Sequence, residues 1–411
     1  MVSTPATFTR SSIAYLPDTG AQVPANVPRF PVVAGRRGLL VEEGTTNLLS
    51  AANSQGFSSP VDVTVTVGQK YTVSMTGTGS IALSGAGTGT VTAGNPVTIT
   101  AASTTLTLTP TGTTGRVQVE QKAYATSWQL GGAPRAAEVL TINPAAVLNT
   151  SEGTIEAWVY VGTSGTGIRE TSVNRYIFSM RGATDSQNSL RIYHSNGNLW
   201  YVNVYDESGT PSGNGVTDTL TSGWHLIGVR FSSARLGLLI DGVEVAVVVN
   251  PSLMSTIPSS AYIGLWASGS YGWCNTIISQ FRISSRARTD AEILAAYQSG
   301  TLTYDSDTTY LLPLQGDLYP HNPRILLKAA DFKELPIPQG SIGLWSGTVA
   351  SVESYLKPLG FELADGSASY HDPSYTKPAL LDGRFVKSVT NPSDTPGSTS
   401  GSETHVHTVV L

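Results

Sequence analysis

The sequence predicts an all-β protein that consists of modular antiparallel β-sandwiches. Short segments in which apolar and polar residues alternate recur along the chain, and this alternation is typical of strands with one buried face. Turns rich in Gly, Ser and Asn separate these segments, as they do in antiparallel sandwiches. Because 411 residues are too many for one ordinary core, we expect two to four domains.

The composition restricts the partners that this chain can have. Only 13% of its residues are charged, whereas an average globular protein has about a quarter. A surface of uncharged hydroxyl and amide groups favours an exported or particle-borne β protein over a cytosolic enzyme. The net charge of −5, with no Lys/Arg patch, argues against nucleic acid as a partner. The single cysteine, Cys274, excludes an internal disulfide framework and is expected to be a small buried hydrophobe.

Neither a secretion signal nor a membrane span is expected. The segment after Met1 has no basic start followed by an apolar run, and no apolar stretch approaches the ~20 residues that span a bilayer. A protein that suits the outside of a cell but lacks an export signal is explained by assembly in the host cytoplasm onto a particle that lysis releases.

Residues 1–50 are expected to form an extended arm that ends in a short strand and a turn, because they are rich in proline and have little periodicity. The segments Phe8–Ser12, Val27–Phe30 and Gly38–Leu49 resemble a leader that recurs in tail and fibre proteins of bacteriophages. These segments contain no nucleophile–base pair, so an attachment or packing role is expected.

Residues 51–137 are expected to form a small β-sandwich. Alternation of apolar and polar residues, Val with Asp and Thr in Val61–Val67 and Leu with Thr in Thr105–Thr109, predicts strands with one wet face. Gly79–Gly94 is low in complexity and is expected to be a loop. The closing segment, Arg116–Trp128, resembles the end of the carbohydrate-module-like domain that follows the same leader in phage fibre proteins.

Residues 138–302 carry the longest core pattern. The segment 152–161 alternates so that Ile155, Ala157 and Val159 are expected to face a core, and Asp241-Gly242 predicts a tight hairpin turn. Further strands are expected at 175–180, 189–194, 199–205, 224–231, 236–240, 243–249, 261–266 and 276–283.

The motifs of this run resemble, in their order, the concanavalin A-like (laminin-G-like) jelly roll. They are Thr154–Val159, Gly223-Trp224-His225, the hairpin 238–245, Phe281–Arg288 and the helical closing segment Thr289–Tyr297. The resemblance implies a two-sheet sandwich of a kind often used to hold sugars, although a fold alone does not fix a function.

Residues 303–336 are interpreted as a linker, and residues 337–411 as a tail-collar-like domain. Four segments resemble the phage tail-collar or fibre-tip family: Ile337–Gly347, Pro358–Gly366, Leu380–Lys387 and Gly401–Thr408. The resemblance implies a trimer in which His405 and His407 bind a metal ion on the threefold axis.

The two histidines also suit a metal site by their spacing. Residues two apart on a strand point to the same face, so three chains would offer six imidazoles to an octahedral transition-metal ion. Binding requires neutral imidazole and should fade as the pH falls through about 6. The alternative is a solvated tail, because the preceding residues are rich in Ser, Thr and Gly.

Candidate carbohydrate-binding residues are Tyr271, Trp273, Trp266 and Asn275. Flat aromatic faces framed by amide and carboxylate groups are what sugar recognition requires. The alternative for Trp273 is that it fills the core. Other aromatic residues suited to stacking are Trp200, Tyr201 and Tyr205. Calcium is not expected, because Ser279 and Gln280 stand where relatives carry an acidic residue.

Catalysis is not expected. A glycosidase needs two carboxylates that face each other across the scissile bond. Asp206 and Glu207 are adjacent and point in opposite directions, and Asp241 lies in a turn. His371-Asp372, near Ser367 and Ser369, lies in a predicted loop.

These observations together predict a virion fibre protein of a tailed bacteriophage that attaches to host-surface polysaccharide. We expect a homotrimer that contacts other virion structural proteins and a host cell-surface glycan, with no nucleic acid and no membrane insertion. The alternatives are a purely structural appendage, such as a head fibre or decoration protein, and a polysaccharide depolymerase.

Overall fold

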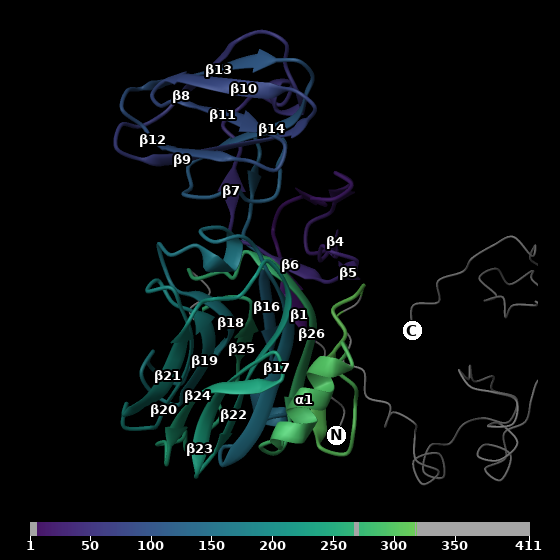
Figure 1. Ribbon diagram of the computed structural model, residues 1–411, viewed down its shortest axis with the longest axis vertical. Coiled ribbons are helices and arrows are strands. Elements are labelled where there is room, and N and C mark those ends of the chain that lie inside the picture. The colour runs from purple at the N-terminus through teal and green to yellow at the C-terminus, as the bar shows by residue number, and fades with distance from the viewer. Residues whose placement is uncertain (1–5, 267–270, 317, 319–411) are drawn as a thin grey trace, which may run out of the picture. The chain divides into compact units, whose positions relative to one another are not determined.

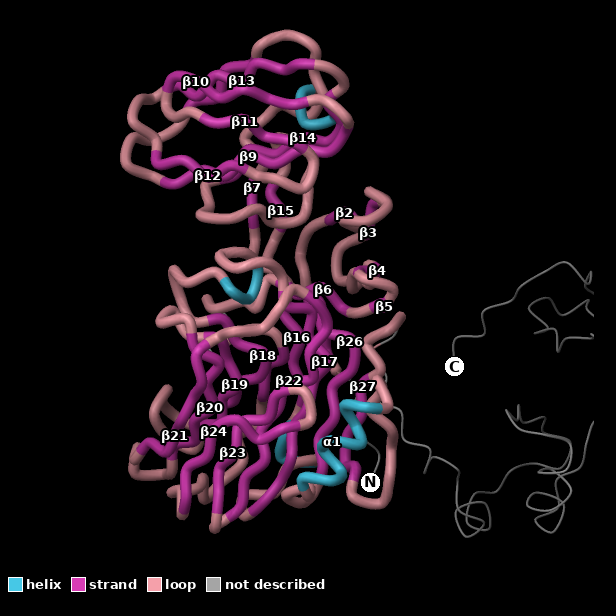
Figure 2. Tube along the Cα trace, viewed as in Figure 1, coloured by secondary structure: helices cyan, strands magenta, loops and turns pink. Residues whose placement is uncertain are grey.

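The computed structural model describes residues 6–266, 271–316 and 318, which form two β-sandwiches and an N-terminal arm (Figures 1 and 2). The predicted all-β class is confirmed: every sheet in this part of the chain is antiparallel, and its one α-helix is α1 (Asp290–Gln298).

The small sandwich lies within the predicted range 51–137. Its four-stranded sheet has the order β11 (Gly89–Thr92), β10 (Ser80–Gly85), β13 (Thr105–Thr111) and β8 (Val61–Thr64), and its three-stranded sheet has β12 (Val97–Thr100), β9 (Lys70–Gly77) and β14 (Thr114–Glu120). Alternation determines which side chains are buried, as Leu106 and Leu108 show on β13. The loop predicted for Gly79–Gly94 is wrong, because most of it is β10 and β11: Ile81, Leu83 and Val91 supply core side chains that the glycine-rich composition obscures.

The larger sandwich has two facing sheets. The first sheet has the order β1 (Thr7–Thr9), β16 (Val139–Ile142), β25 (Ala261–Ile263), β18 (Arg175–Met180), β19 (Ser189–His194), β20 (Leu199–Tyr205) and β21 (Pro211–Thr217). The second has the order β24 (Val243–Val249), β23 (Arg235–Ile240), β22 (Gly223–Ser232), β17 (Glu152–Val161), β26 (Thr276–Ser284) and β27 (Thr308–Leu312), and β6 (Leu39–Val41) also pairs with β26. Between the sheets, Phe178 and Phe281 stack with their ring centroids 5.7 Å apart.

The larger sandwich extends beyond the predicted 138–302. From the arm, β1 joins the first sheet and β6 joins the second, and β27 lies in the segment interpreted as a linker. The small sandwich is therefore inserted into the chain of the larger one. Both connections run through a short antiparallel ribbon of β7 (Thr45–Thr46) and β15 (Pro134–Arg135).

Short elements complete the described chain. They are the strand pairs β2 (Ala14–Tyr15) with β3 (Gln22–Val23) and β4 (Val32–Val33) with β5 (Arg36–Arg37), and the 3-10 turns η1 (Asn53–Gln55), η2 (Pro144–Ala146) and η3 (Gly167–Arg169).

The central strands of the second sheet, β17 and β26, are buried on both faces. Trp158, on the side of β17 predicted to be wet, is 4% exposed, because α1 and the chain after it cover this outer face with Ala296, Leu302 and Leu311. The helix begins at a capping box: the Thr289 hydroxyl accepts from the Glu292 backbone N–H, and the Glu292 carboxylate accepts from the Thr289 N–H.

A cluster of buried charges, the arm cluster, joins the arm to the segment before β16. Its members are Arg10, Arg29, Glu42, Arg135 and Glu138. The Glu138 carboxylate accepts from Arg10 Nη1 at 2.8 Å, from Arg29 Nε at 2.7 Å and from the Glu42 backbone N–H at 3.1 Å. Burial alone would raise the pKa of Glu42, but Arg135, Arg29 and a hydrogen bond from Ser127 lower it to about 2. Glu42 is therefore ionised at neutral pH.

The predicted turn at Asp241-Gly242 is confirmed. Both residues have positive φ, 51° and 84°, as the favoured two-residue hairpin turn requires. The Asp241 carboxylate accepts from the Leu226 N–H at 3.0 Å and contacts His225 Nδ1 at 2.7 Å, and His225 Nε2 lies 3.0 Å from the Thr221 carbonyl oxygen. Since both ring nitrogens face acceptors, the imidazolium form is favoured. Burial alone would lower the pKa of His225, but Asp241 and the Thr221 carbonyl outweigh burial and raise it.

We expect this histidine to stabilise the fold most at low pH. Because its folded pKa is raised, the native state binds its proton more tightly, and the stabilisation is fully present below the unfolded pKa of about 6.5. It should disappear as the pH rises through the folded pKa. Melting temperatures of the wild type and His225→Asn should differ most below about pH 6.5. Asp241→Asn keeps a residue that tolerates the turn and removes the charge, so it should abolish this dependence; a wild-type advantage that grows with pH would contradict the assignment.

Candidate functional site

The outer face of the first sheet carries aromatic side chains on adjacent strands, and we call this surface the tyrosine face. Tyr176, Tyr193 and Tyr201 lie on β18, β19 and β20, with ring centroids 5.1 Å and 5.5 Å apart along the row. Their strand neighbours Ile192 and Val202 point into the core, so alternation sends the tyrosines outward. The tyrosine face consists of Tyr176, Arg191, Tyr193, Tyr201, Tyr205, Tyr262, Trp266 and Tyr271.

Tyr201 lies flat because the neighbouring edge strand lacks side chains beside it. A Cβ atom at Gly215 would lie 2.4 Å from the Tyr201 ring, and one at Gly213 would lie 3.0 Å from it. The ring thus covers the backbone of β21, as aromatic residues do opposite glycines in sheets. Tyr201 is half-buried, so part of its ring stays open to solvent.

Arg191 gives the tyrosine face a positive charge. Its guanidinium carbon lies 4.7 Å from the Tyr205 ring centroid and 4.2 Å from that of Trp266, both within cation–π range. Tyr271 follows at the rim, 6.2 Å from Trp266. Burial raises the pKa of Tyr271, as does the charge of Asp185, a carboxylate that pairs with Arg181. Flat rings bordered by guanidinium and carboxylate groups can contact both the apolar and the hydroxyl faces of a sugar.

The structure brings together only part of the predicted carbohydrate set. Tyr271 is 44% exposed and can stack on a ligand, but Trp266 is 1% exposed and supports the tyrosine face from beneath. Trp273 is 8% exposed, fills the core and donates from its indole N–H to the Glu138 carbonyl at 2.8 Å. The prediction of stacking by Trp266 and Trp273 is therefore corrected, because neighbouring side chains already cover both rings.

Asn275 is also corrected, because it is buried away from the tyrosine face. Its amide donates to Glu43 at 2.9 Å and to the Tyr124 hydroxyl at 2.8 Å, and so links the arm to the sandwiches. Among the other aromatic residues considered, Trp200 is 1% exposed in the core, whereas Tyr201 and Tyr205 lie on the tyrosine face.

Tyr176, Tyr193 and Arg191 were not predicted; Tyr176 and Tyr193 are buried, at 3% and 9% exposed, and support the surface instead of lying open on it. A usable signal exists in β19, where Arg191 and Tyr193 alternate with Leu190 and Ile192. His405, His407 and the residues around His371 lie outside the described residues. Within residues 6–266 and 271–316, no group of three or more His, Cys, Asp or Glu could hold a metal ion.

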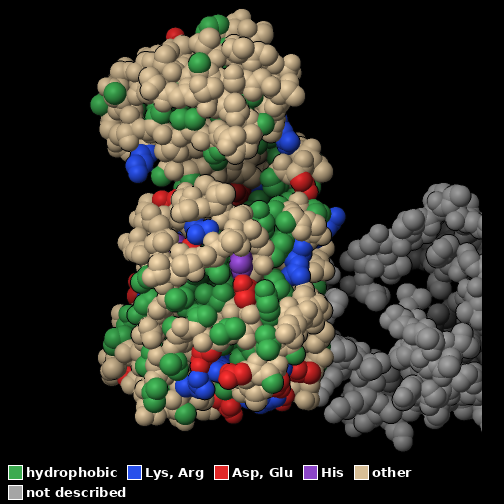
Figure 3. All heavy atoms as spheres, in the orientation of Figure 1, with side chains coloured by type: hydrophobic (Ala, Val, Ile, Leu, Met, Phe, Trp, Pro, Cys, Tyr) green, Lys and Arg blue, Asp and Glu red, His purple; other side chains and the backbone are tan. Residues whose placement is uncertain are grey.

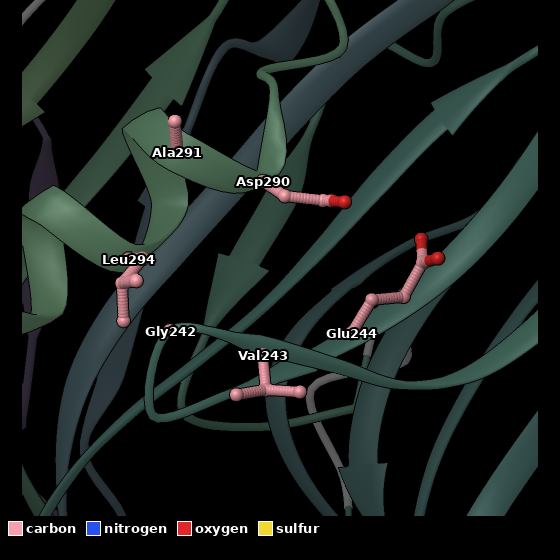
Figure 4. A pocket seen from close by; sticks show the side chains of 6 residues that line it. All are labelled: Gly242, Val243, Glu244, Asp290, Ala291 and Leu294. Carbon is pink, nitrogen blue, oxygen red and sulfur yellow. The ribbon is translucent and has the colours of Figure 1, made fainter.

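A separate shallow pocket lies where the β23–β24 turn meets α1 (Figure 4). It has a volume of about 380 Å³ and is lined by Gly242, Val243, Glu244, Asp290, Ala291 and Leu294. Both of its carboxylates are paired: Arg230 contacts Glu244 at 2.8 Å and Asp290 at 2.5 Å. The pocket therefore offers a ligand an apolar wall but no unpaired charge.

Fold and surface together define an all-β domain with an aromatic outer face. Residues 134–294 match the Laminin_G_3 family model, described as the concanavalin A-like lectin/glucanases superfamily. The chain therefore contains a concanavalin A-like, laminin-G-like domain, as the order of its motifs predicts. No curated protein sequence matches the chain. Among the described residues, no helix is long and apolar enough to cross a membrane.

Solved structures with some similarity include two binding domains of neurotoxins. The receptor binding domain of botulinum neurotoxin C/D mosaic serotype has a TM-score of 0.30 and 11% identity, over 40% of this chain and 40% of that one. The botulinum neurotoxin serotype G binding domain has a TM-score of 0.28 and 14% identity, over 39% and 40%. This chain thus covers well under half of either one, and scores this low carry no functional conclusion.

Proposed function

We propose that this protein is a virion fibre protein of a tailed bacteriophage that attaches the particle to polysaccharide on the host surface. The leader and collar motifs of the sequence support the virion assignment, and the concanavalin A-like domain supports binding. The observation that carries the proposal is the tyrosine face, where the Arg191 guanidinium lies over the rings of Tyr205 and Trp266, and the exposed ring of Tyr271 lies beside Trp266.

The proposed chemistry is contact without bond cleavage. Ring faces stack on the C–H faces of sugars, while Arg191 and Asp185 offer a donor and an acceptor to hydroxyl groups. Each such site is expected to bind weakly. A homotrimer, attached through other virion proteins and assembled in the host cytoplasm, would convert weak contacts into stable attachment through avidity. A transition-metal ion held by His405 and His407 on the trimer axis remains a proposal.

We expect Tyr201→Ala and Tyr271→Ala each to weaken glycan binding about 2- to 10-fold, because an aromatic contact contributes ~0.5–1.5 kcal/mol. Binding is measured on a glycan array and on surface polysaccharide extracted from bacteria that the full-length protein decorates. Tyr160→Ala is the matched control, since Tyr160 is a half-buried tyrosine on the opposite sheet, packed edge-on against Trp224.

Glycan binding, incorporation into virions and release of reducing ends together separate the alternatives. Wild-type protein that binds no glycan but is incorporated into virions would favour a head fibre or decoration protein. Release of new reducing ends from the polysaccharide would indicate a depolymerase. Equal binding by the wild type and both tyrosine variants would place the sugar contact elsewhere.

A further inference from the structure

The edge strand of the second sheet exposes a row of apolar side chains, which we call the valine row. It consists of Val243, Val245, Val247 and Val249 on β24, which are 56%, 38%, 38% and 69% exposed. Proteins usually protect a strand at a sheet edge with charges, proline or a covering segment. None of the four positions has such a residue, and Leu294 of α1, 41% exposed, lies next to Val243 in the shallow pocket.

The row results from the register of β24 on β23. Ala246 and Val248 pack against the core, so Val247 and Val249 point outward. A register shift between Leu238 and Leu239 leaves Val245 without a partner on β23. Figure 3 shows hydrophobic side chains on the visible surface of this sandwich, with charged side chains gathered towards one end.

The charges beside the row are already neutralised within the chain. Glu244 contacts both Arg230 and Arg235, and Asp290 contacts Arg230. Two guanidinium groups thus face two carboxylates, and Figure 4 shows the two carboxylates lying close together beside the pocket. Where a surface meets its own copies around a symmetry axis, an unpaired charge near that axis lies close to its own copy and is repelled. The valine row can meet a second copy without this penalty.

Among residues 6–266, 271–316 and 318, no segment covers the four valine side chains, which are 38% to 69% exposed. β24 is one edge of the second sheet, whereas β27, after which the described chain ends at Leu318, belongs to the other end of the strand order. On the neighbouring sheet edge, the Asn214 amide donates to the Val247 carbonyl at 3.0 Å. That acceptor is occupied, so a partner would pack on the valine side chains instead of adding a strand at this point.

We propose that the valine row is a contact surface between copies of this chain. The inference rests on the proposed function in one respect, the assembly of several copies into a fibre, and specifies where those copies meet. Its driving force is the burial of valine side chains that water surrounds in the single chain.

Cysteine cross-linking tests the proposal directly. The native Cys274 is fully buried, and burial raises its thiol pKa to about 12, so it should not react. Val245→Cys and Val247→Cys in the full chain are each treated with a short bis-maleimide and run on a denaturing gel. Val67→Cys is the matched control, because Val67 is 55% exposed on the small sandwich. We expect most chains of the row variants to shift to the mass of a linked pair, while the control stays at single-chain mass.

Failure of the inference is distinguishable from failure of the proposed assembly. If light scattering shows that the wild type contains several copies but the row variants cross-link no better than Val67→Cys, the valine row is not the contact surface, and the proposed assembly is unaffected. A wild type that is a single chain in solution would overturn both. If a variant does not fold, hydrogen exchange of the wild type decides: exchange over residues 243–249 that is unchanged on dilution would refute the contact.

Discussion

Replacement of Glu138 by alanine is expected to lower the free energy of unfolding by about 3 to 5 kcal/mol, the usual cost of removing one member of a buried ion pair. Arg10 and Arg29, both fully buried, would lose the carboxylate that accepts their hydrogen bonds at 2.8 Å and 2.7 Å. Arg29 would retain Glu42, but Arg10 would be left with backbone carbonyls alone. Urea unfolding followed by tryptophan fluorescence measures the loss.

The matched control is Glu207→Ala. Glu207 is exposed, and its carboxylate contacts the Ser255 hydroxyl at 2.6 Å, so its replacement should change stability by no more than about 0.5 kcal/mol. Proteases should also cut the arm faster in Glu138→Ala than in the control. Equal stability of the two variants would show that the arm cluster does not hold the arm in place.

Replacement of Trp266 by alanine should cost about 3 to 5 kcal/mol, as expected for a buried tryptophan. Its ring is 1% exposed, 4.8 Å from Tyr176 and 4.2 Å from the Arg191 guanidinium. Without it, the tyrosine face should also lose its shape, so glycan binding should fall together with stability.

Tyr271→Ala provides the comparison, because this ring contacts Trp266 from the exposed side of the same surface. It should reduce binding while changing the free energy of unfolding by no more than about 1 kcal/mol. Chemical unfolding and glycan binding are measured on both variants. If Trp266→Ala were as stable as Tyr271→Ala but bound no glycan, Trp266 would be a ligand contact and its packed role would be refuted.

Local pattern was sufficient for the class of the fold and for the main strands. Alternation within β17 and the Asp241-Gly242 turn are properties of adjacent residues, and both predict the observed elements. The strands β1 and β27 were not predicted, and for β6, the short strand expected at the end of the arm, the pairing with β26 was not foreseen, since each of the three pairs with a strand distant in sequence. Local periodicity contains no information about such pairing.

The candidate site was only partly predictable for a related reason. Tyr271 and Trp266 are close in sequence to Trp273, and nothing in their spacing tells which ring is covered. The Trp266 ring is covered by Arg191 and Tyr176, which come from two other strands. The strand of Tyr176 also has an irregular register between Tyr176 and Phe178. In the same way, Glu138 and Arg29 have the residue types of a surface, and only the folded arm buries them.

The paired strands β7 and β15 have a consequence for how such a protein can vary. The chain enters and leaves the small sandwich through two paired strands that lie side by side, so the small sandwich is attached to the larger one by two adjacent connections. A domain attached by two connections rotates less freely than a domain attached by one. A different small domain whose two ends lie equally close together can therefore replace the small sandwich without a change in the larger sandwich.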